Sequence, residues 1–347
     1  MKFQYDKLNE RLYNMIKYII KRILTIIPII IGLSLLMFLL SRFMPGDPVR
    51  LKLGPNASAS QIYAMQEQLG LHKSIIIQYF NYLTGIFRGD LGMSIRTGRN
   101  VAVDIAETFP ATFELVVFGV IIAAAVGIPL GVISSTRYNK WPDFVIRIFS
   151  MSGIAIPSFL LAILLQLIFG YWLGIAPIIG RGDILPLKIT GLNLLDSILT
   201  GNGAAFMDGL KHIILPAVSL SIATCAQIMR ITRSNMMSQL NKDYILAAKS
   251  YGLPKNIVEN RYMLKNAFTS VLTIIGMEFG SLIGNAFTIE TVYGWPGMAE
   301  YSIKGLMYKD YNSIISVTLV IGLLFAVINI VVDIFYSAID PRIKIGN

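Results

Sequence analysis

Six stretches of mostly apolar residues recur along the chain, each long enough to cross a bilayer and each separated from the next by polar segments. A helix of about 20 residues spans the roughly 30 Å of hydrocarbon in a membrane. The pattern therefore predicts an all-α membrane protein with about six transmembrane helices. Their approximate bounds are 18–43, 110–134, 148–173, 213–236, 268–289 and 314–338.

The composition supports this prediction and excludes a soluble globular protein. Hydrophobic residues make up 54% of the 347 positions and charged residues 14%, against about 25% charged residues in a soluble domain. The first stretch is too long for the apolar region of a signal peptide and lacks a small-x-small cleavage site, so we expect it to be a retained span. Cys225 is the single cysteine, which rules out a disulfide framework within the chain.

The basic residues predict the orientation. Segments on one side of the predicted spans carry 18 of the 30 Lys and Arg residues, and basic residues collect on the cytoplasmic side of a membrane. Both termini are therefore expected in the cytoplasm, and topology accounts for the net charge of +10 without nucleic-acid binding. The expected organisation is a cytoplasmic tail at 1–17, a first helix at 18–43, an external segment at 44–109, a five-helix core at 110–338 and a cytoplasmic tail at 339–347.

The two long external segments show different patterns. In the first, residues 60–69 and 74–87 are expected to be helical, and the glycine-rich stretch 88–94 is expected to turn. The second, 174–210, contains prolines and glycines that favour irregular structure.

The loop at 241–258, between the fourth and fifth predicted spans, contains a short predicted helix. Asn241 or Asp243 is expected to cap it, and Gly252 can end it because glycine readily adopts positive φ. Pro254 can open the next helix. Ile245, Ala248 and Leu253 would form an apolar patch suited to a groove in a partner. From physics alone, an amphipathic connector resting on the membrane surface fits equally well.

The stretch Ala247-Ala248-x-x-x-Gly252-Leu253 resembles the signature loop of ATP-binding-cassette importer permeases. Leu246 stands where the wider motif often has glutamate, a departure shared by the dipeptide/oligopeptide/nickel branch. Further segments resembling that branch follow in order from about residue 15 to residue 344. They are Pro45-Gly46-Asp47-Pro48, Gly89-Asp90-Leu91-Gly92-x-Ser94, Pro110-Ala111-Thr112-x-Glu114-Leu115, Pro157-Ser158-Phe159, Leu215-Pro216-Ala217, Met229-Arg230-x-Thr232-Arg233-Ser234, Asp243-Tyr244-Ile245, Glu290-Thr291-Val292-Tyr293-Gly294-Trp295-Pro296-Gly297 and Asp340-Pro341-Arg342.

This resemblance implies a type I importer permease fold in a prokaryotic plasma (inner) membrane. It implies a second homologous permease, two ATPase subunits that bind ATP and Mg, and an external substrate-binding protein. The chain is similar to the member of the permease pair with the large external segment, and Met15 is an alternative to Met1 as its start. The expected cargo is peptides first and nickel or another metal chelate second. The residues expected to couple to the ATPases are Asp243, Tyr244, Ile245, Ala247, Ala248, Gly252 and Leu253.

Ionisable residues inside spans are functional candidates because their burial in lipid is costly. Glu278 and Asn285, seven residues apart on one helical face, are expected near the translocation pathway, although Glu278 could instead hydrogen-bond to neighbouring helices. Glu290 and the Gly294-Trp295 turn could line an outer gate or anchor the helix end. Glu114 and Asp333 are expected to be structural.

Neither a metal site nor a catalytic site is expected in this chain. His72 and His212 are far apart in sequence, and we expect neither to have acidic or cysteine companions at ligand spacing. The chain has no Gly-x-x-x-x-Gly-Lys-Ser/Thr phosphate loop, so ATP hydrolysis is expected in partner chains. His-Glu-x-x-His and Gly-x-Ser-x-Gly are also absent, which disfavours a membrane hydrolase. The remaining rival is a stand-alone secondary transporter, which should show inverted repeats and discontinuous helices; neither is visible in the sequence.

Overall fold

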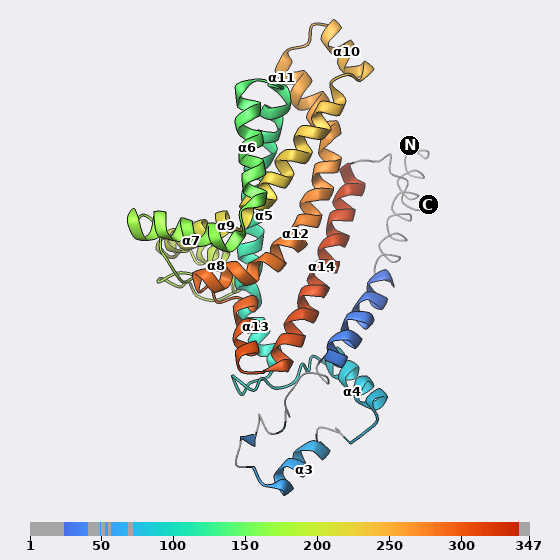
Figure 1. Ribbon diagram of the computed structural model, residues 1–347, viewed down its shortest axis with the longest axis vertical. Helices are drawn as coiled ribbons and strands as arrows, with labels where there is room; N and C mark the ends of the chain where they lie inside the picture. Colours follow the sequence, from blue (N-terminus) through green and yellow to red (C-terminus); the bar gives the residue numbers. More distant parts are fainter. Residues whose placement is uncertain (1–23, 41–48, 50–52, 55–56, 69–71, 340–347) are drawn as a thin grey trace. The chain divides into compact units, whose positions relative to one another are not determined.

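The structure is a computed structural model that describes residues 24–40, 49, 53–54, 57–68 and 72–339 (Figure 1). These residues form two compact units. The first contains the described residues of 110–296 and 327–347, and the second contains those of 20–109 and 297–326. Apart from an isolated bridge between Met93 and Asn100, the described parts consist of helices and loops, which confirms the all-α prediction.

Within the described residues, four helical runs are long and apolar enough to cross a membrane. They are α5 (Val101–Thr136), α9 (Gly203–Gln239), the run Lys255–Tyr293, and residues 311–332 of α14 (Tyr311–Ile339). The third run joins α11 (Lys255–Ile257), the π-helix η2 (Val258–Leu264) and α12 (Lys265–Tyr293). The predicted first span lies partly outside the described residues, which include its apolar helix Leu24–Leu40.

The predicted third span is interrupted in the structure, so the prediction of one continuous helix over 148–173 is wrong. The helix α6 (Trp141–Ala155) ends before Pro157, and the chain continues as α7 (Ser158–Leu165) and η1 (Gln166–Trp172). The two halves are bent by 106° and form a broken span or a re-entrant loop (Figure 1). Proline disfavours helical geometry in the residue before it, and Ile156 is extended at φ −80° and ψ 124°. The chain therefore contains a discontinuous helix pair that its sequence pattern did not reveal.

Several helices extend beyond their apolar stretches. The helix α5 begins nine residues before position 110, and α9 begins at Gly203, ten residues before position 213. The Asn202 side chain caps α9 by accepting a hydrogen bond of 3.0 Å from the Ala205 N–H. A short helix, α8 (Asn193–Leu199), lies in the loop that was predicted to be irregular. The apolar stretches of the sequence therefore identified these helices but not the polar residues at their ends.

Glycines bring α5 and α9 into close contact in the first unit. A Cβ on Gly127 would lie 2.8 Å from the Cys225 carbonyl oxygen, and one on Gly131 would lie 2.6 Å from Thr232 Cβ. The two glycines form a small-xxx-small motif, which allows helix backbones to approach closely in membranes. Ile228 and Met229 of α9 are buried in the core next to this contact.

The second unit includes α3 (Ala59–Gln68), α4 (Ile75–Phe87) and α13 (Met298–Met307). The helices α3 and α4 confirm the two predicted over 60–69 and 74–87. The buried Asp310 accepts hydrogen bonds from the Ser94 and Ser313 hydroxyls. Tyr301 bonds to Ser313 at 2.7 Å and donates to Asp104 at 3.0 Å. These contacts hold the glycine-rich turn against α13 and the start of α14.

Candidate functional site

The loop between α9 and α11 forms the predicted short helix, α10 (Asp243–Ser250). Its N-cap is Lys242, in extended geometry and without a side-chain capping bond, so the prediction of Asn241 or Asp243 at that position is wrong. Asp243 lies in the first turn instead, where its charge complements the helix dipole. Gly252 adopts φ +71°, as predicted for the residue that ends this segment, and Pro254 precedes α11 as its N-cap.

The expected apolar patch on α10 faces inward. Ile245 is fully buried and Ala248 is 5% exposed, and both belong to a core cluster with Met236, Val258 and Met263. Leu253 is half-buried against the same cluster. The prediction that these three side chains form a free docking surface is therefore wrong in this structure. Their contacts fix α10 on the ends of α9 and η2.

The exposed face of α10 consists of different residues. Tyr244, Leu246 and Ala247 are exposed, and Tyr251, directly after the helix, is 86% exposed. We name Tyr244, Leu246, Ala247, Tyr251 and Gly252 the outer face of α10. Three of these residues are among those predicted to couple to the ATPases, whereas Leu246 and Tyr251 were not predicted. The helical spacing of Ile245 and Ala248, which places both on one inward side, is the signal that could have identified them.

A cavity of about 330 Å³ lies beside this helix in the first unit. Its lining includes Thr136, Leu240, Lys249 and Leu253. Lys255 and Glu259, also in the lining, form an ion pair at 3.5 Å. At Gly252, next to Leu253 of the lining, an added Cβ would meet nothing within 4 Å.

The three residues predicted for the translocation pathway differ in their burial and contacts. Glu278 and Asn285 on α12 are half-buried, and Glu278 accepts a hydrogen bond of 3.1 Å from the Thr224 hydroxyl on α9. Glu290 is fully buried and accepts a hydrogen bond of 2.6 Å from Thr112 on α5. Glu290 therefore joins two helices in this conformation and does not line an open space.

The turn at the end of α12 is also enclosed. Gly294 has left-handed geometry with φ +55° and ends the helix. Trp295 is 1% exposed, and its indole Nε1 donates to the Ala111 carbonyl at 2.9 Å. Of the two roles considered for this turn, anchoring the helix end fits these contacts.

Buried carboxylates hold the loop before α8 in place. Glu114 on α5 pairs with Arg181 at 2.6 Å and accepts the Leu194 N–H at 2.8 Å, in agreement with its expected structural role. Asp196 accepts hydrogen bonds from the Ile189, Thr190 and Gly191 N–H groups and from the Thr190 hydroxyl. Burial alone would raise the pKa of Asp196, but these bonds outweigh burial and lower the pKa below its usual range.

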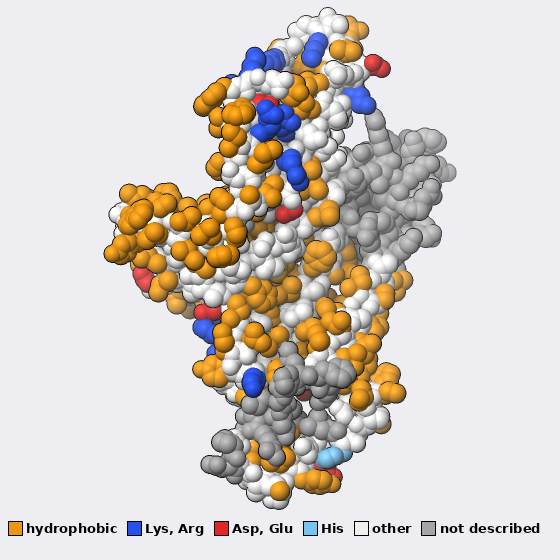
Figure 2. Space-filling model, viewed as in Figure 1, with side chains coloured by type: hydrophobic (Ala, Val, Ile, Leu, Met, Phe, Trp, Pro, Cys, Tyr) orange, Lys and Arg blue, Asp and Glu red, His pale blue; other side chains and the backbone are white. Residues whose placement is uncertain are grey.

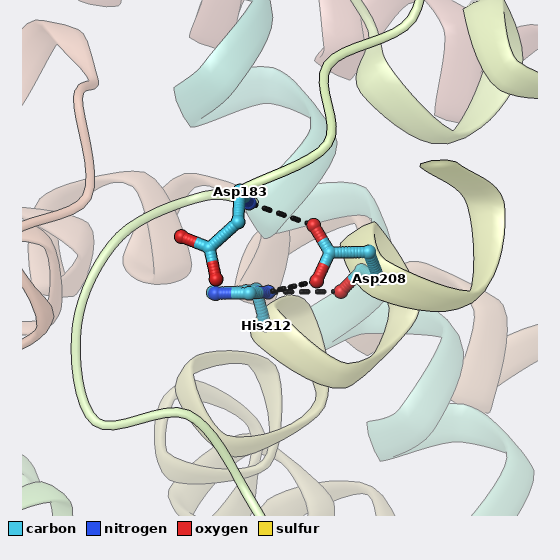
Figure 3. A group of neighbouring side chains, drawn as sticks. All are labelled: Asp183, Asp208 and His212. Carbon is cyan, nitrogen blue, oxygen red and sulfur yellow. Dashed lines mark hydrogen bonds and ion pairs between the residues drawn. The ribbon is translucent and has the colours of Figure 1, made fainter. Parts of the chain in front are cut away.

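His212 has acidic neighbours, so the judgement that it lacks them is wrong. Asp208 precedes it by one helical turn, and the loop brings Asp183 to the same place (Figure 3). The Asp208 carboxylate accepts the Asp183 and Ile184 N–H groups at 2.7 and 2.9 Å. His212 Nδ1 lies 2.9 Å from the Asp208 carbonyl oxygen. The ligand-type atoms of the three residues lie within 4.8 Å of one another, and His212 Nδ1 lies 3.4 Å from a carboxylate oxygen of Asp208. The hydrogen bonds to Asp208 therefore hold the loop at Asp183 and Ile184 against α9.

The long apolar helices define the class of the chain as a multi-pass membrane protein. Residues 127–345 match the family model described as "Binding-protein-dependent transport system inner membrane component", and residues 15–116 match the corresponding N-terminal model. The chain belongs to this family, and it is a permease of the ATP-binding-cassette importer type that its motifs resemble.

Three curated relatives show how closely the chain follows the family. It is 36% identical over 332 residues to a dipeptide transport system permease protein of Alkalihalophilus pseudofirmus, covering 95% of this chain and all of the relative. It is 37% identical to a probable D,D-dipeptide transport system permease protein of Escherichia coli strain K12, covering 92% and 94% of the two chains. It is 34% identical to a glutathione transport system permease protein of Escherichia coli, covering 95% and 99%.

Proposed function

We propose that this permease imports peptides as one of two membrane subunits. It pairs with a homologous permease, receives substrate from an external binding protein, and is driven by two ATPase subunits that hold ATP and Mg. The similar permeases named for dipeptides and glutathione support a peptide cargo over a metal chelate. Uptake of labelled dipeptides, glutathione and nickel by the reconstituted transporter tests the cargo, and saturable uptake of nickel alone would contradict it.

The observation that carries the proposal is the outer face of α10. Exposed aromatic and aliphatic side chains there are held in place by the buried Ile245 and Ala248. An exposed face on a fixed helix suits docking into a cleft of an ATPase. ATP-driven movement of the ATPases would then displace α10 together with η2 and α12, shifting the bundle between inward-facing and outward-facing states.

The same proposal places α10 and both chain termini in the cytoplasm of a prokaryotic plasma membrane. Lys249 lies in α10, and Lys242 and Lys255 lie close to its two ends in the sequence. In Figure 2 basic side chains gather over the end of the first unit that carries α10 and α11. Cysteines placed at Ser58 and Ser250, with Cys225 removed, should react oppositely with an impermeant maleimide in intact cells. Equal labelling of both sites would refute this topology.

Two adjacent alanines allow a matched test of docking. Ala247 is exposed and Ala248 is buried within the chain. Ala247→Glu should leave the permease folded but cost about 2–5 kcal/mol at a buried ATPase interface, so the ATPases should be lost on co-purification. Ala248→Glu should instead destabilise the permease itself, because the charge is buried among Met236, Val258 and Met263.

The readouts are the thermal stability of the permease, co-purification of the ATPases and substrate-stimulated ATP hydrolysis in proteoliposomes. Ala59→Glu, on an exposed position of α3, is the matched control and should change none of them. Wild-type assembly and stimulation in Ala247→Glu would show that α10 is a surface connector.

A further inference from the structure

A second cavity, of about 220 Å³, lies between α6 and α9 in the first unit. Three arginines line it, Arg147 from α6 and Arg230 and Arg233 from α9, and the lining contains no carboxylate. Met151 and Met229 form apolar walls beside them. The cavity therefore combines concentrated positive charge with hydrocarbon surface.

Among the described residues, Asp143 lies behind this cavity and balances part of its charge. Asp143 is fully buried and pairs with Arg233 through two hydrogen bonds, at 2.8 and 3.1 Å. Arg147 Nε lies 3.7 Å from the same carboxylate and has no hydrogen-bond acceptor within the described part of the chain. Arg230 donates to the neutral amide of Gln227 at 2.6 Å. Two guanidinium groups thus face the cavity without a carboxylate in hydrogen-bond contact.

The surroundings place the cavity at the level of a membrane surface. Tyr138, in the turn before α6, and Trp141, its first residue, are exposed aromatic residues, a type that collects where a bilayer meets water. Phe144, Ile148 and Met151 are also exposed on α6, and their helical spacing puts them on one face. That face continues from the arginines along the helix and offers apolar surface to an acyl chain.

We propose that this cavity binds the headgroup phosphate of an anionic phospholipid. Arg147 and Arg230 donate hydrogen bonds to the phosphate oxygens, in the paired geometry that guanidinium groups favour. The acyl chains lie along Phe144, Ile148 and Met151. The methionine walls and the exposed α6 face favour a lipid over free phosphate, which gains nothing from apolar surface. Basic pockets between membrane helices suit such headgroups.

The test is native mass spectrometry of the purified, delipidated transporter, titrated with phosphatidylglycerol or with phosphatidylcholine of the same acyl chains. The wild-type complex should bind phosphatidylglycerol at lower concentration than phosphatidylcholine. Arg147→Gln with Arg230→Gln should raise the half-saturating phosphatidylglycerol concentration about tenfold or more, since charged hydrogen bonds are lost. Arg230→Gln alone, on an exposed side chain, provides the same test if the double variant is poorly produced. Arg233 is left unchanged because its loss would leave the buried Asp143 without its main ion-pair partner.

Arg137→Gln is the matched control, because Arg137 is exposed at the same end of the bundle and does not line the cavity. It should bind phosphatidylglycerol as the wild type does. The proposal is overturned if the cavity variants bind as tightly as the wild type, if Arg137→Gln weakens binding equally, or if the wild type shows no preference for phosphatidylglycerol. Displacement of the lipid by millimolar inorganic phosphate would show a free-anion site instead.

Discussion

Arg181 donates through Nε and Nη2 to one carboxylate oxygen of Glu114, at 3.2 and 2.6 Å. Both side chains are largely enclosed, so the loop that carries Arg181 is held to α5 by charges removed from water. A third bond runs from Arg181 to the Gly191 carbonyl at 2.8 Å. Arg181 therefore connects its loop both to Glu114 on α5 and to Gly191 before α8.

Arg181→Gln should be strongly destabilising, since it leaves the Glu114 carboxylate buried without a countercharge. Breaking a buried ion pair in this way costs about 3–5 kcal/mol. Thermal unfolding of the purified transporter measures the loss. Lys188→Gln, on an exposed residue of the same loop, should have little effect. Equal melting temperatures for Arg181→Gln and the wild type would show that the pair contributes nothing.

Gly131→Ala should weaken the packing of α5 on α9, because the new methyl group would overlap Thr232 and the Met229 carbonyl. Overpacking of this kind costs about 1–3 kcal/mol. Gly284→Ala, in the interior of α12 where a Cβ meets nothing within 4 Å, should be neutral or slightly stabilising. Melting temperatures of both variants in detergent provide the comparison, and a neutral Gly131→Ala would refute the close contact.

Because the pKa of Asp196 is lowered in the folded protein, we expect the stability of the fold to decrease as the pH falls. A carboxyl group whose pKa is lower in the folded state contributes stability above its unfolded pKa, about 4, and loses it as the pH falls through the folded pKa. Asp196→Asn should therefore be less stable by about 1–3 kcal/mol at pH 7 and should lose less on acidification below pH 4. Unfolding at several pH values tests this, with Asp90→Asn as an exposed control. A stability difference between wild type and Asp196→Asn that is the same at every pH would contradict this prediction.

Glu278→Gln should preserve the fold and change selectivity. Glutamine keeps an acceptor oxygen for the Thr224 hydroxyl but removes the negative charge. If Glu278 lies beside the pathway, uptake of lysine-containing dipeptides should fall several-fold more than uptake of alanine dipeptides, corresponding to about 1 kcal/mol. Glu290→Gln, which alters a buried acid bonded to Thr112, should not discriminate between them. An equal decrease in the uptake of both peptides would show that Glu278 does not lie beside the pathway.

The sequence could predict those features that depend on local composition. Apolar length located the long helices, and the need for positive φ identified Gly252. The bend at Ile156 was missed because membrane helices often tolerate proline, and only the surrounding packing decides whether the chain continues straight. The direction in which Ile245 and Ala248 point was missed for a similar reason, since an apolar patch fits a partner and the protein's own core equally well.

The contacts around Asp183, Asp196 and Arg181 could not be predicted, because they join residues that only the folded loop brings together. The spacing of Asp208 and His212 was visible in the sequence, but the position of Asp183 beside them in the fold was not. Buried Glu290 shows the same limit. An acid near the end of a span suggests a gate, but its bond to Thr112 depends on how α5 and α12 pack.

The close contact at Gly127 and Gly131 restricts how the permease can move. Side chains of α9 occupy the space beside these glycines, so α5 and α9 cannot slide along one another by a residue without separating. Shear between packed helices is one general route for conformational change, and this interface blocks it. We therefore expect α5 and α9 to move as one rigid unit, together with α10, which packs on the end of α9.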